Sequence, residues 1–159
     1  MTEFETLISS RSWSAYPWDY PSAIYLQFRS DSSAELTFGY GQTIYAVIKC
    51  RFALSEPNKL TLFYLDSPAY QRFKGFKPSP GCESRTLRYS LAQHTVAFEV
   101  PYEGPVMFHW RLTVDRSPFP DGRMLPDIPV PRDYYGYREE LESDSETVVS
   151  NDVIGEAKY

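Results

Sequence analysis

Residues 24–40, IYLQFRSDSSAELTFGY, alternate apolar and polar side chains on both sides of a short polar segment. Ile24, Leu26 and Phe28 share one face of a first strand, because successive side chains of a strand point to opposite faces. Residues 29–33 have the composition of a tight turn, and residues 36–40 resume the alternation. The stretch therefore predicts a β-hairpin with one apolar face.

The same alternation recurs to about residue 115, in short runs separated by turn-forming residues. Seven runs are predicted as strands: residues 24–28, 36–40, 44–52, 60–65, 85–91, 95–100 and 106–115. Residues 92–94 and 101–105 are predicted connections. Short strands at this spacing are typical of antiparallel sheets. The pattern predicts an all-β fold, either a single antiparallel barrel or a sandwich.

Residues 66–83 form the main irregular insert between the predicted strands. The insert is rich in Pro and Gly, and the basic residues in it or beside it are Arg72, Lys74, Lys77 and Arg85. Long loops of compact domains often bind ligands. A ligand-binding loop is therefore predicted here, with solvent-exposed packing as the alternative.

Prolines dominate the next segment, with five of them between residues 118 and 131. Proline fixes φ and has no N–H to donate, so residues 116–137 are predicted to wrap the domain as extended chain. A short helix is predicted over residues 132–142. Tyr134, Tyr135 and Tyr137 would anchor this segment on the surface. Residues 1–142 are thus predicted to form one domain, and residues 143–159 an acidic, flexible tail.

Charge and composition limit the partners. The 159-residue chain has a formal charge of −5, and six acidic residues with no Lys or Arg lie between positions 139 and 152. The rest of the chain carries a net charge of +1 and has no basic stripe, so nucleic acid is not an expected partner. The acidic tail would be the contact for a protein partner.

The expected location is the cytoplasm, without membrane association. The first residues lack the positive charge and long apolar run of a secretory signal, and no run of the chain approaches membrane-spanning length. The only two cysteines, Cys50 and Cys82, are typical of a reduced compartment.

Trp13 ends the segment LISSRSW before the predicted strands, and Trp110 and Arg111 lie on the last of them. Over residues 7–115 the chain resembles the lipocalin-like or calycin group of small β-barrels. That group has Gly-x-Trp before its first strand, and an Arg or Lys of its last strand lies across the Trp ring. The resemblance implies that Arg111 stacks on Trp13 and plugs one barrel end; Arg11 stands where the group has Gly. Residues 110–120 and 134–136 also resemble segments of small fungal proteins, which implies nothing about function.

Aromatic residues make up 16% of the chain, and they favour strands and line ligand cavities. The apolar set of residues 106–115, centred on Trp110, is predicted to face the interior. In the alternative, the polar set with His109 and Arg111 faces it. A small hydrophobic or aromatic molecule is the predicted ligand. The residues predicted to bind it are Trp110, Phe108, Phe38, Tyr40, Tyr64 and Phe98.

No motif of the chain names a reaction. Neither His94 nor His109 has metal-ligand spacing to a second ligand, so neither a metal nor any other cofactor is predicted. A cofactor-independent lyase, isomerase or cyclase would need polar groups within the strands. The candidate catalytic residues are His109, Arg111, Glu99, Arg88 and Tyr25.

Three functions therefore stay open. The favoured hypothesis is binding of a small hydrophobic or aromatic molecule in a barrel cavity. The alternative is a cofactor-independent enzyme that acts in the same cavity. The second alternative is a protein-interaction module that uses the Pro-rich segment and the acidic tail.

Overall fold

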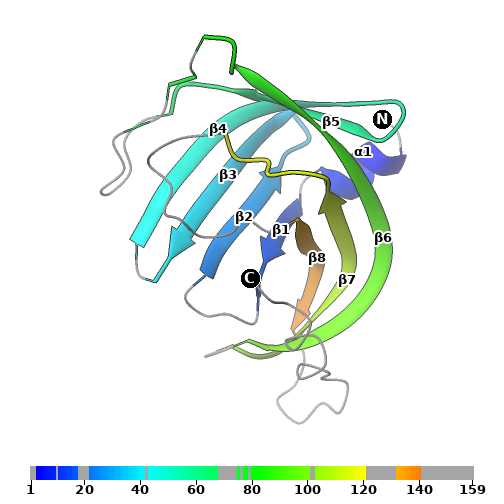
Figure 1. Ribbon diagram of the computed structural model, residues 1–159. Coiled ribbons are helices and arrows are strands. Elements are labelled where there is room, and N and C mark those ends of the chain that lie inside the picture. Colours follow the sequence, from blue (N-terminus) through cyan, green and yellow to red (C-terminus); the bar gives the residue numbers. More distant parts are fainter. Residues whose placement is uncertain are drawn as a thin grey trace.

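The computed structural model describes residues 3–9, 11–17, 22–41, 43–67, 75, 77–78, 80–100, 103–120 and 132–140. Their elements are α1 (Glu3–Ile8), β1 (Arg11–Ala15), β2 (Ser22–Phe28), β3 (Ser33–Tyr40), β4 (Thr43–Ser55), β5 (Lys59–Tyr64), β6 (Ser84–Val100), β7 (Gly104–Val114) and β8 (Asp133–Glu140). The eight strands form one closed antiparallel barrel, in which each strand pairs with its neighbours in sequence and β8 pairs with β1 (Figure 1). The predicted antiparallel all-β fold is confirmed, and of the two alternatives, barrel and sandwich, the structure has the barrel.

The two ends of the barrel follow from this strand order, because alternate connections of a meander lie at the same end. The helix end holds α1 and the connections β2–β3, β4–β5 and β6–β7. The other end holds the connections β1–β2, β3–β4, β5–β6 and β7–β8. We call it the plugged end, because residues 117–120 after β7 close it.

The main core fills the barrel interior and has the predicted alternation. Ile24, Leu26 and Phe28 of β2 are at most 1% exposed, and Leu36 and Phe38 of β3 are fully buried. A second, smaller cluster is formed by Val96, Phe98, Val100, Val106, Phe108 and Tyr135. The apolar set of β7 is divided between the two clusters, since Leu112 and Val114 belong to the main core. Four members of the predicted apolar face, Val106, Phe108, Leu112 and Val114, are buried, whereas its central member Trp110 is only half-buried.

Strand β6 corrects one predicted connection. Residues 92–94 lie inside the continuous strand Ser84–Val100, and the register shifts between Gln93 and Val96. A β-bulge adds one residue and so reverses which positions face inward. Leu87 and Tyr89 are buried before the shift, and Val96 and Phe98 after it. In the sequence, this change in the alternation of apolar and polar residues looks like a connection between two separate strands, which is why residues 92–94 were predicted as one.

Strand β8 corrects the prediction for the Pro-rich segment. The helix predicted over residues 132–142 is wrong, because Asp133–Glu140 pairs with β7 from Thr113 to Val106 and closes the sheet. Without β8, the free edges of β7 and β1 would leave main-chain N–H and C=O groups without partners. The closing strand supplies partners for them. The predicted wrap is therefore wrong for residues 133–137. Residues 121–131 and the tail 143–159 lie outside the described residues.

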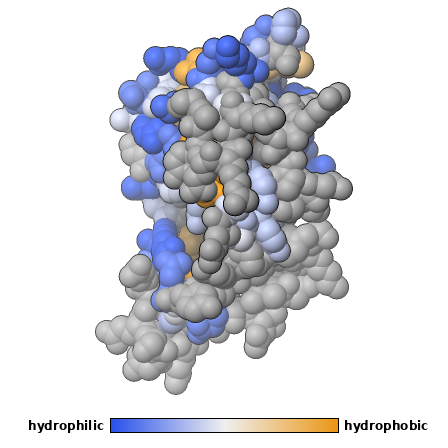
Figure 2. Space-filling view, turned by 90° about the vertical axis from the view of Figure 1, so that its left-hand side faces the viewer, coloured by the Kyte–Doolittle hydropathy of each residue, from blue (hydrophilic) through white to orange (hydrophobic). Residues whose placement is uncertain are grey.

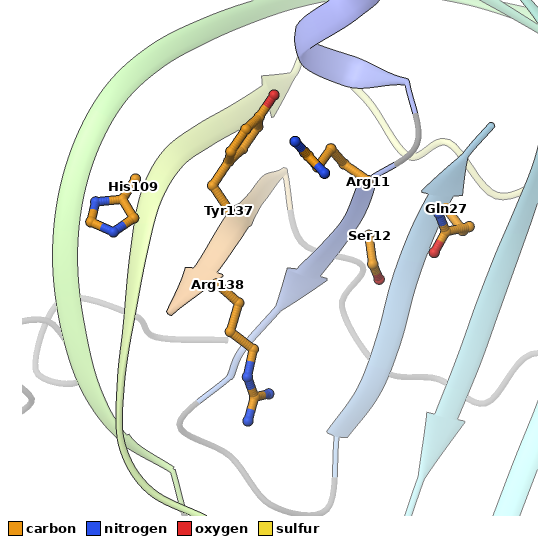
Figure 3. A pocket seen from close by; sticks show the side chains of 6 residues that line it. All are labelled: Arg11, Ser12, Gln27, His109, Tyr137 and Arg138. Carbon is orange, nitrogen blue, oxygen red and sulfur yellow. The ribbon is translucent and has the colours of Figure 1, made fainter. Parts of the chain in front are cut away.

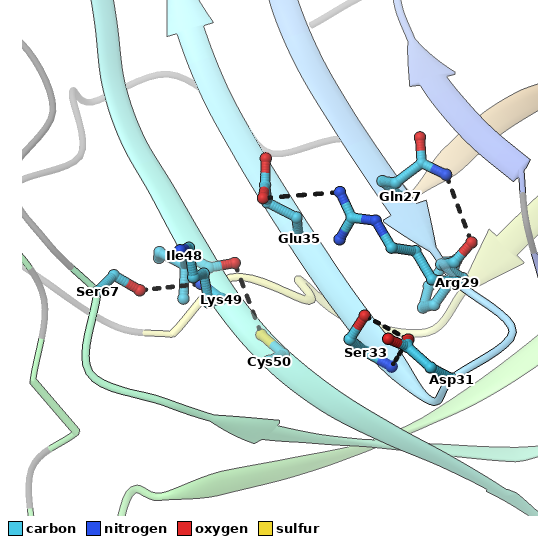
Figure 4. A network of polar contacts seen from close by, with 10 residues as sticks. Gln27, Arg29, Asp31, Ser33, Glu35, Ile48, Lys49, Cys50 and Ser67 are labelled. Carbon is cyan, nitrogen blue, oxygen red and sulfur yellow. Dashed lines mark hydrogen bonds and ion pairs between the residues drawn. The ribbon is translucent and has the colours of Figure 1, made fainter.

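Polar contacts cover the outside of β2 to β4 (Figure 4). Asp31 accepts a hydrogen bond from the Ser33 N–H at 2.9 Å and so closes the β2–β3 turn. The Ser67 hydroxyl accepts one from the Lys49 N–H at 2.9 Å and ties the chain after β5 to β4. Residues 68–74, 76 and 79 of the predicted ligand-binding loop lie outside the described residues. On the face shown in Figure 2 the described residues are mostly hydrophilic, with small separate hydrophobic spots.

Candidate functional site

An aromatic ring from outside the strands fills the barrel interior at the plugged end. Phe119 follows β7, is 1% exposed and belongs to the main core. Its ring meets the ring of Phe38 edge to face, with the centroids 5.5 Å apart. In Figure 1 this segment (yellow) runs from the end of β7 toward β4. Phe119 therefore closes this end of the barrel from within.

Two strand side chains hold this plug through its main-chain carbonyl groups. The Arg85 guanidinium, at the start of β6, donates to the carbonyl oxygens of Ser117 at 3.0 Å and Phe119 at 2.6 Å. The Tyr64 hydroxyl, at the end of β5, donates to the carbonyl oxygen of Pro118 at 2.6 Å. Arg85 was predicted only as part of a basic loop. Its position shows that it holds the plug.

Tyr134 was predicted to anchor its segment on the surface; this is wrong, because its side chain lies in the main core and places a polar group inside the barrel. Its side chain is 0% exposed, and its hydroxyl has no hydrogen-bond partner among the residues that the structure describes. Burial raises the pKa of the Tyr134 phenol well above its usual value, and the neighbouring Tyr16 adds to the rise. Because Tyr16 directly follows β1, the Tyr134 hydroxyl lies in the half of the barrel toward the plugged end. A buried hydroxyl left unpaired costs about 1–3 kcal/mol of stability.

Three of the six residues predicted to bind ligand lie at or beside the main core. Phe38 and Tyr64 are buried and both contact the plug, as described above. Trp110 is half-buried and packs against the main core, with its ring centroid 6.2 Å from that of Tyr137. Trp110 was predicted to be buried in the core or at a cavity wall, and it lies at the edge of the core.

The other three predicted ligand-binding residues lie elsewhere. Phe98 and Phe108 belong to the second cluster, and their ring centroids are 6.0 Å apart. Tyr40 ends β3 and is 41% exposed. The predicted set is thus divided among the plugged end, the second cluster and the surface.

A second candidate site lies where β1 meets β8 (Figure 3). It is a pocket of about 600 Å³, which we call the seam pocket, lined by Arg11, Ser12, Gln27, His109, Tyr137 and Arg138. Three of its lining side chains contact a ring or a carboxylate. The Arg11 guanidinium lies 4.5 Å from the centroid of the Tyr137 ring, His109 Nε2 lies 2.7 Å from the Glu139 carboxylate, and Arg138 pairs with Glu103.

His109 is the only member of the predicted catalytic set that lines the seam pocket. Arg111 is half-buried, and its Nε is buried with no hydrogen-bond partner among the described residues. Arg88 and Glu99 are exposed on β6. Tyr25 is 39% exposed; partial burial raises its pKa, Glu103 adds to the rise and Arg138 opposes it. Within the described part of the chain, no hydrogen bond or ion pair joins any two of these five side chains.

The contact implied for Trp13 and Arg111 is not formed. Arg111 is in register with Tyr135, and Tyr135 with Ser14. Its side chain therefore begins on the sheet face opposite to that of Trp13. The ring of Trp13 instead lies on Gly136, where an added Cβ would be 2.6 Å from an indole carbon.

Comparison with known proteins adds no assignment: no family model matches the chain, and neither the curated proteins nor the solved structures gave a match. In the described ranges, no group of three or more His, Cys, Asp or Glu side chains is placed to hold a metal ion. No helix in those ranges is long and apolar enough to cross a membrane.

Proposed function

We propose that this chain binds a small aromatic or apolar molecule, bearing one hydrogen-bonding group, inside the barrel at the plugged end. The observation that carries the proposal is the buried Tyr134 hydroxyl, which has no partner in the described part of the chain. Native proteins pair nearly all of their buried polar groups, so an exception is a reason to look for a ligand. A ligand atom that accepts or donates a hydrogen bond would satisfy this hydroxyl.

Phe119 indicates the size and chemistry of the bound group. Its ring occupies the interior although it belongs to a connection and not to a strand. Three hydrogen bonds to carbonyl oxygens hold the segment, and none of them is part of the sheet. The plug is therefore able to leave without breaking a strand pair. The ligand would take the place of the Phe119 ring beside Phe38 and reach toward Tyr134.

The number and order of the strands support the same proposal. Eight-stranded barrels have an interior that side chains fill or that holds one small ligand, as in lipocalins. The resemblance to the lipocalin-like group is supported by this strand order and by the position of Trp13 near the helix end, where its Nε1 donates to the carbonyl oxygen of Ile8 at 3.4 Å. The different location of Arg111 does not support it.

Catalysis is not part of the proposal, because no hydrogen bond or ion pair in the described part of the chain joins any two of the five residues considered for it. A protein partner of the acidic tail stays a prediction, since residues 143–159 lie outside the described part of the chain.

The proposal is tested with two probes that differ only in a hydroxyl, 2-naphthol and naphthalene. Binding is followed by the intrinsic fluorescence of the probes, titrated with the wild type, Tyr134→Phe and Phe119→Ala. The wild type should bind 2-naphthol more tightly than naphthalene. In Tyr134→Phe the ratio of these two affinities should fall by roughly tenfold. Phe119→Ala should bind both probes more tightly than the wild type does. If neither the wild type nor Phe119→Ala binds either probe, the proposed function is wrong.

A further inference from the structure

The seam pocket exists because β1 and β8 separate soon after they meet. A single residue pair, Ser14 with Tyr135, joins the two strands in the described part of the barrel. The neighbouring pairings are longer, with five residue pairs between β1 and β2 and seven between β7 and β8. Beyond Ser14 the two strands leave room for a pocket.

Trp13 and Tyr137 keep the strands apart. The indole of Trp13 lies directly on Gly136, with ring carbons 2.6 to 2.9 Å from the position of an added Cβ. Tyr137 has a φ of 61°, a left-handed conformation that is uncommon for a residue with a side chain. Its ring lies edge-on to that of Trp13, and its hydroxyl donates to the carbonyl oxygen of Leu7 at 3.0 Å. Such strained residues concentrate at functional sites.

The charges of the pocket leave one cation available. His109 is paired with Glu139, and Arg138 with Glu103. Arg11, in contrast, has no ion pair with any described residue, and its exposed guanidinium lies over the ring of Tyr137. A guanidinium that stacks through its flat face still has its N–H groups free at the edge, where they match a carboxylate.

Neutral polar groups complete the set of donors. Ser12 lies next to Arg11 on β1, and Gln27 is directly opposite Ser12 on β2. The Gln27 amide donates only one long hydrogen bond, 3.4 Å to the carbonyl oxygen of Phe28. One unpaired guanidinium, a hydroxyl and an amide suit a ligand with a single negative charge. The carboxylates of Glu103 and Glu139 nearby disfavour a doubly charged phosphate.

We propose that the seam pocket binds a small aromatic carboxylate, with the Arg11 guanidinium and Ser12 on the carboxylate and the Tyr137 ring beside the apolar body. The volume of about 600 Å³ is in the range of small-molecule sites. Figure 3 shows Arg11 and Tyr137 directed toward each other, with Ser12 on the same strand as Arg11 and Gln27 on the next strand. This site is distinct from the barrel interior and does not depend on the function proposed above.

Benzoate is the probe, and benzamide is its uncharged counterpart. Their affinities are measured by chemical-shift titration of the ¹⁵N-labelled full-length chain, with the backbone signals of residues 11, 12, 137 and 138 as reporters. Wild-type protein should bind benzoate and shift these signals, whereas benzamide should bind at least about tenfold more weakly. Equal binding of the two probes would overturn the proposal.

Two arginine variants separate the site from general charge. Arg11→Gln should weaken benzoate binding by at least about tenfold, whereas Arg29→Gln should leave it unchanged. Arg29 is also exposed but pairs with Glu35 outside the pocket. Arg11→Lys retains the charge but loses the planar fork, and we expect an intermediate affinity. Benzoate binding that is equal in wild type and Arg11→Gln would refute the proposed role of Arg11.

The two proposals fail independently. Tyr134→Phe and Phe119→Ala should leave benzoate binding at the seam unchanged, and Arg11→Gln should leave 2-naphthol binding unchanged. If Phe119→Ala changes the benzoate affinity while Arg11→Gln does not, benzoate enters the barrel and the seam pocket is not its site.

Discussion

The plugged end and the seam pocket differ in how their polar groups are satisfied. At the plugged end Arg85 and Tyr64 are paired with carbonyl groups, and the Tyr134 hydroxyl is buried with no partner within the described ranges. In the seam pocket His109 contacts the Glu139 carboxylate, and Arg138 forms an ion pair with Glu103. Arg11 has no ion pair among the described residues but is exposed to water.

This difference teaches that the same lack of a protein partner has different consequences in the two places. An exposed guanidinium exchanges hydrogen bonds with water and costs the fold little. A buried hydroxyl cannot do so, and its unmet hydrogen bond lowers stability. The plugged end is therefore the place where a ligand would stabilise the fold most, whereas the seam pocket is a site that the fold tolerates at little cost.

The largest expected effect concerns the seam itself. Trp13→Ala removes a ring of β1 that is 0% exposed and lies on Gly136 of β8, and it should lower the free energy of unfolding by about 3–5 kcal/mol. Urea denaturation measures the loss. Trp110→Ala is the matched control, and because Trp110 is only half-buried its loss should be smaller. Equal losses would show that Trp13 has no special role at the seam.

The next effect concerns Gly136, whose lack of a side chain leaves room for the Trp13 ring. Gly136→Ala places a Cβ 2.6 Å from the indole and should cost about 1–3 kcal/mol of unfolding free energy. In a Trp13→Ala background the same change should cost much less, because the ring it contacts is gone. A full cost in both backgrounds would mean that the close approach of Trp13 is not its source.

A matched pair of tyrosines sharpens the comparison. Tyr64→Phe removes a hydroxyl that is bonded to Pro118 at 2.6 Å and should lower the unfolding free energy by about 1–2 kcal/mol. Tyr134→Phe removes the same atom from a hydroxyl without a partner and should leave stability unchanged or raise it. Thermal unfolding of both variants gives the sign. A clear loss in Tyr134→Phe would show that its hydroxyl is satisfied in solution.

The last effect concerns the buried thiol of Cys50. It is the smallest at neutral pH and becomes measurable only at alkaline pH. Burial raises the pKa of the Cys50 thiol to about 12. The folded protein then binds this proton more tightly than the unfolded chain, so the stabilisation is complete below the unfolded pKa of about 8.5. It is lost as the pH rises from there toward about 12.

Cys50→Ala should therefore flatten the fall in unfolding free energy between about pH 8.5 and pH 10, measured by urea denaturation across this range. Cys82→Ala, at an exposed cysteine, should leave the fall as it is. Identical slopes in the wild type and Cys50→Ala would contradict the assigned burial effect.

Several parts of the barrel could be predicted from short sequence windows. The faces of β2 and β3 follow from alternating residues such as Ile24, Leu26 and Phe38, which are all buried. The candidate sites were less accessible. Arg85 and Phe119 are 34 positions apart in the sequence and meet at the plug. The one local signal was Pro-Phe-Pro at 118–120, an aromatic residue held in extended chain by prolines on both sides.

The sequence by itself determined that the chain forms an antiparallel all-β barrel or sandwich, and it determined which side of most strands is buried. The reason is local: a strand reverses its side chains at every residue, and apolar residues leave water. Only the tertiary structure decided that Asp133–Glu140 is a strand, that Phe119 plugs one end and that Tyr134 lacks a partner. These outcomes depend on residues far apart in sequence, such as Tyr64 and Pro118 at a separation of 54, and no local pattern specifies which distant groups will meet.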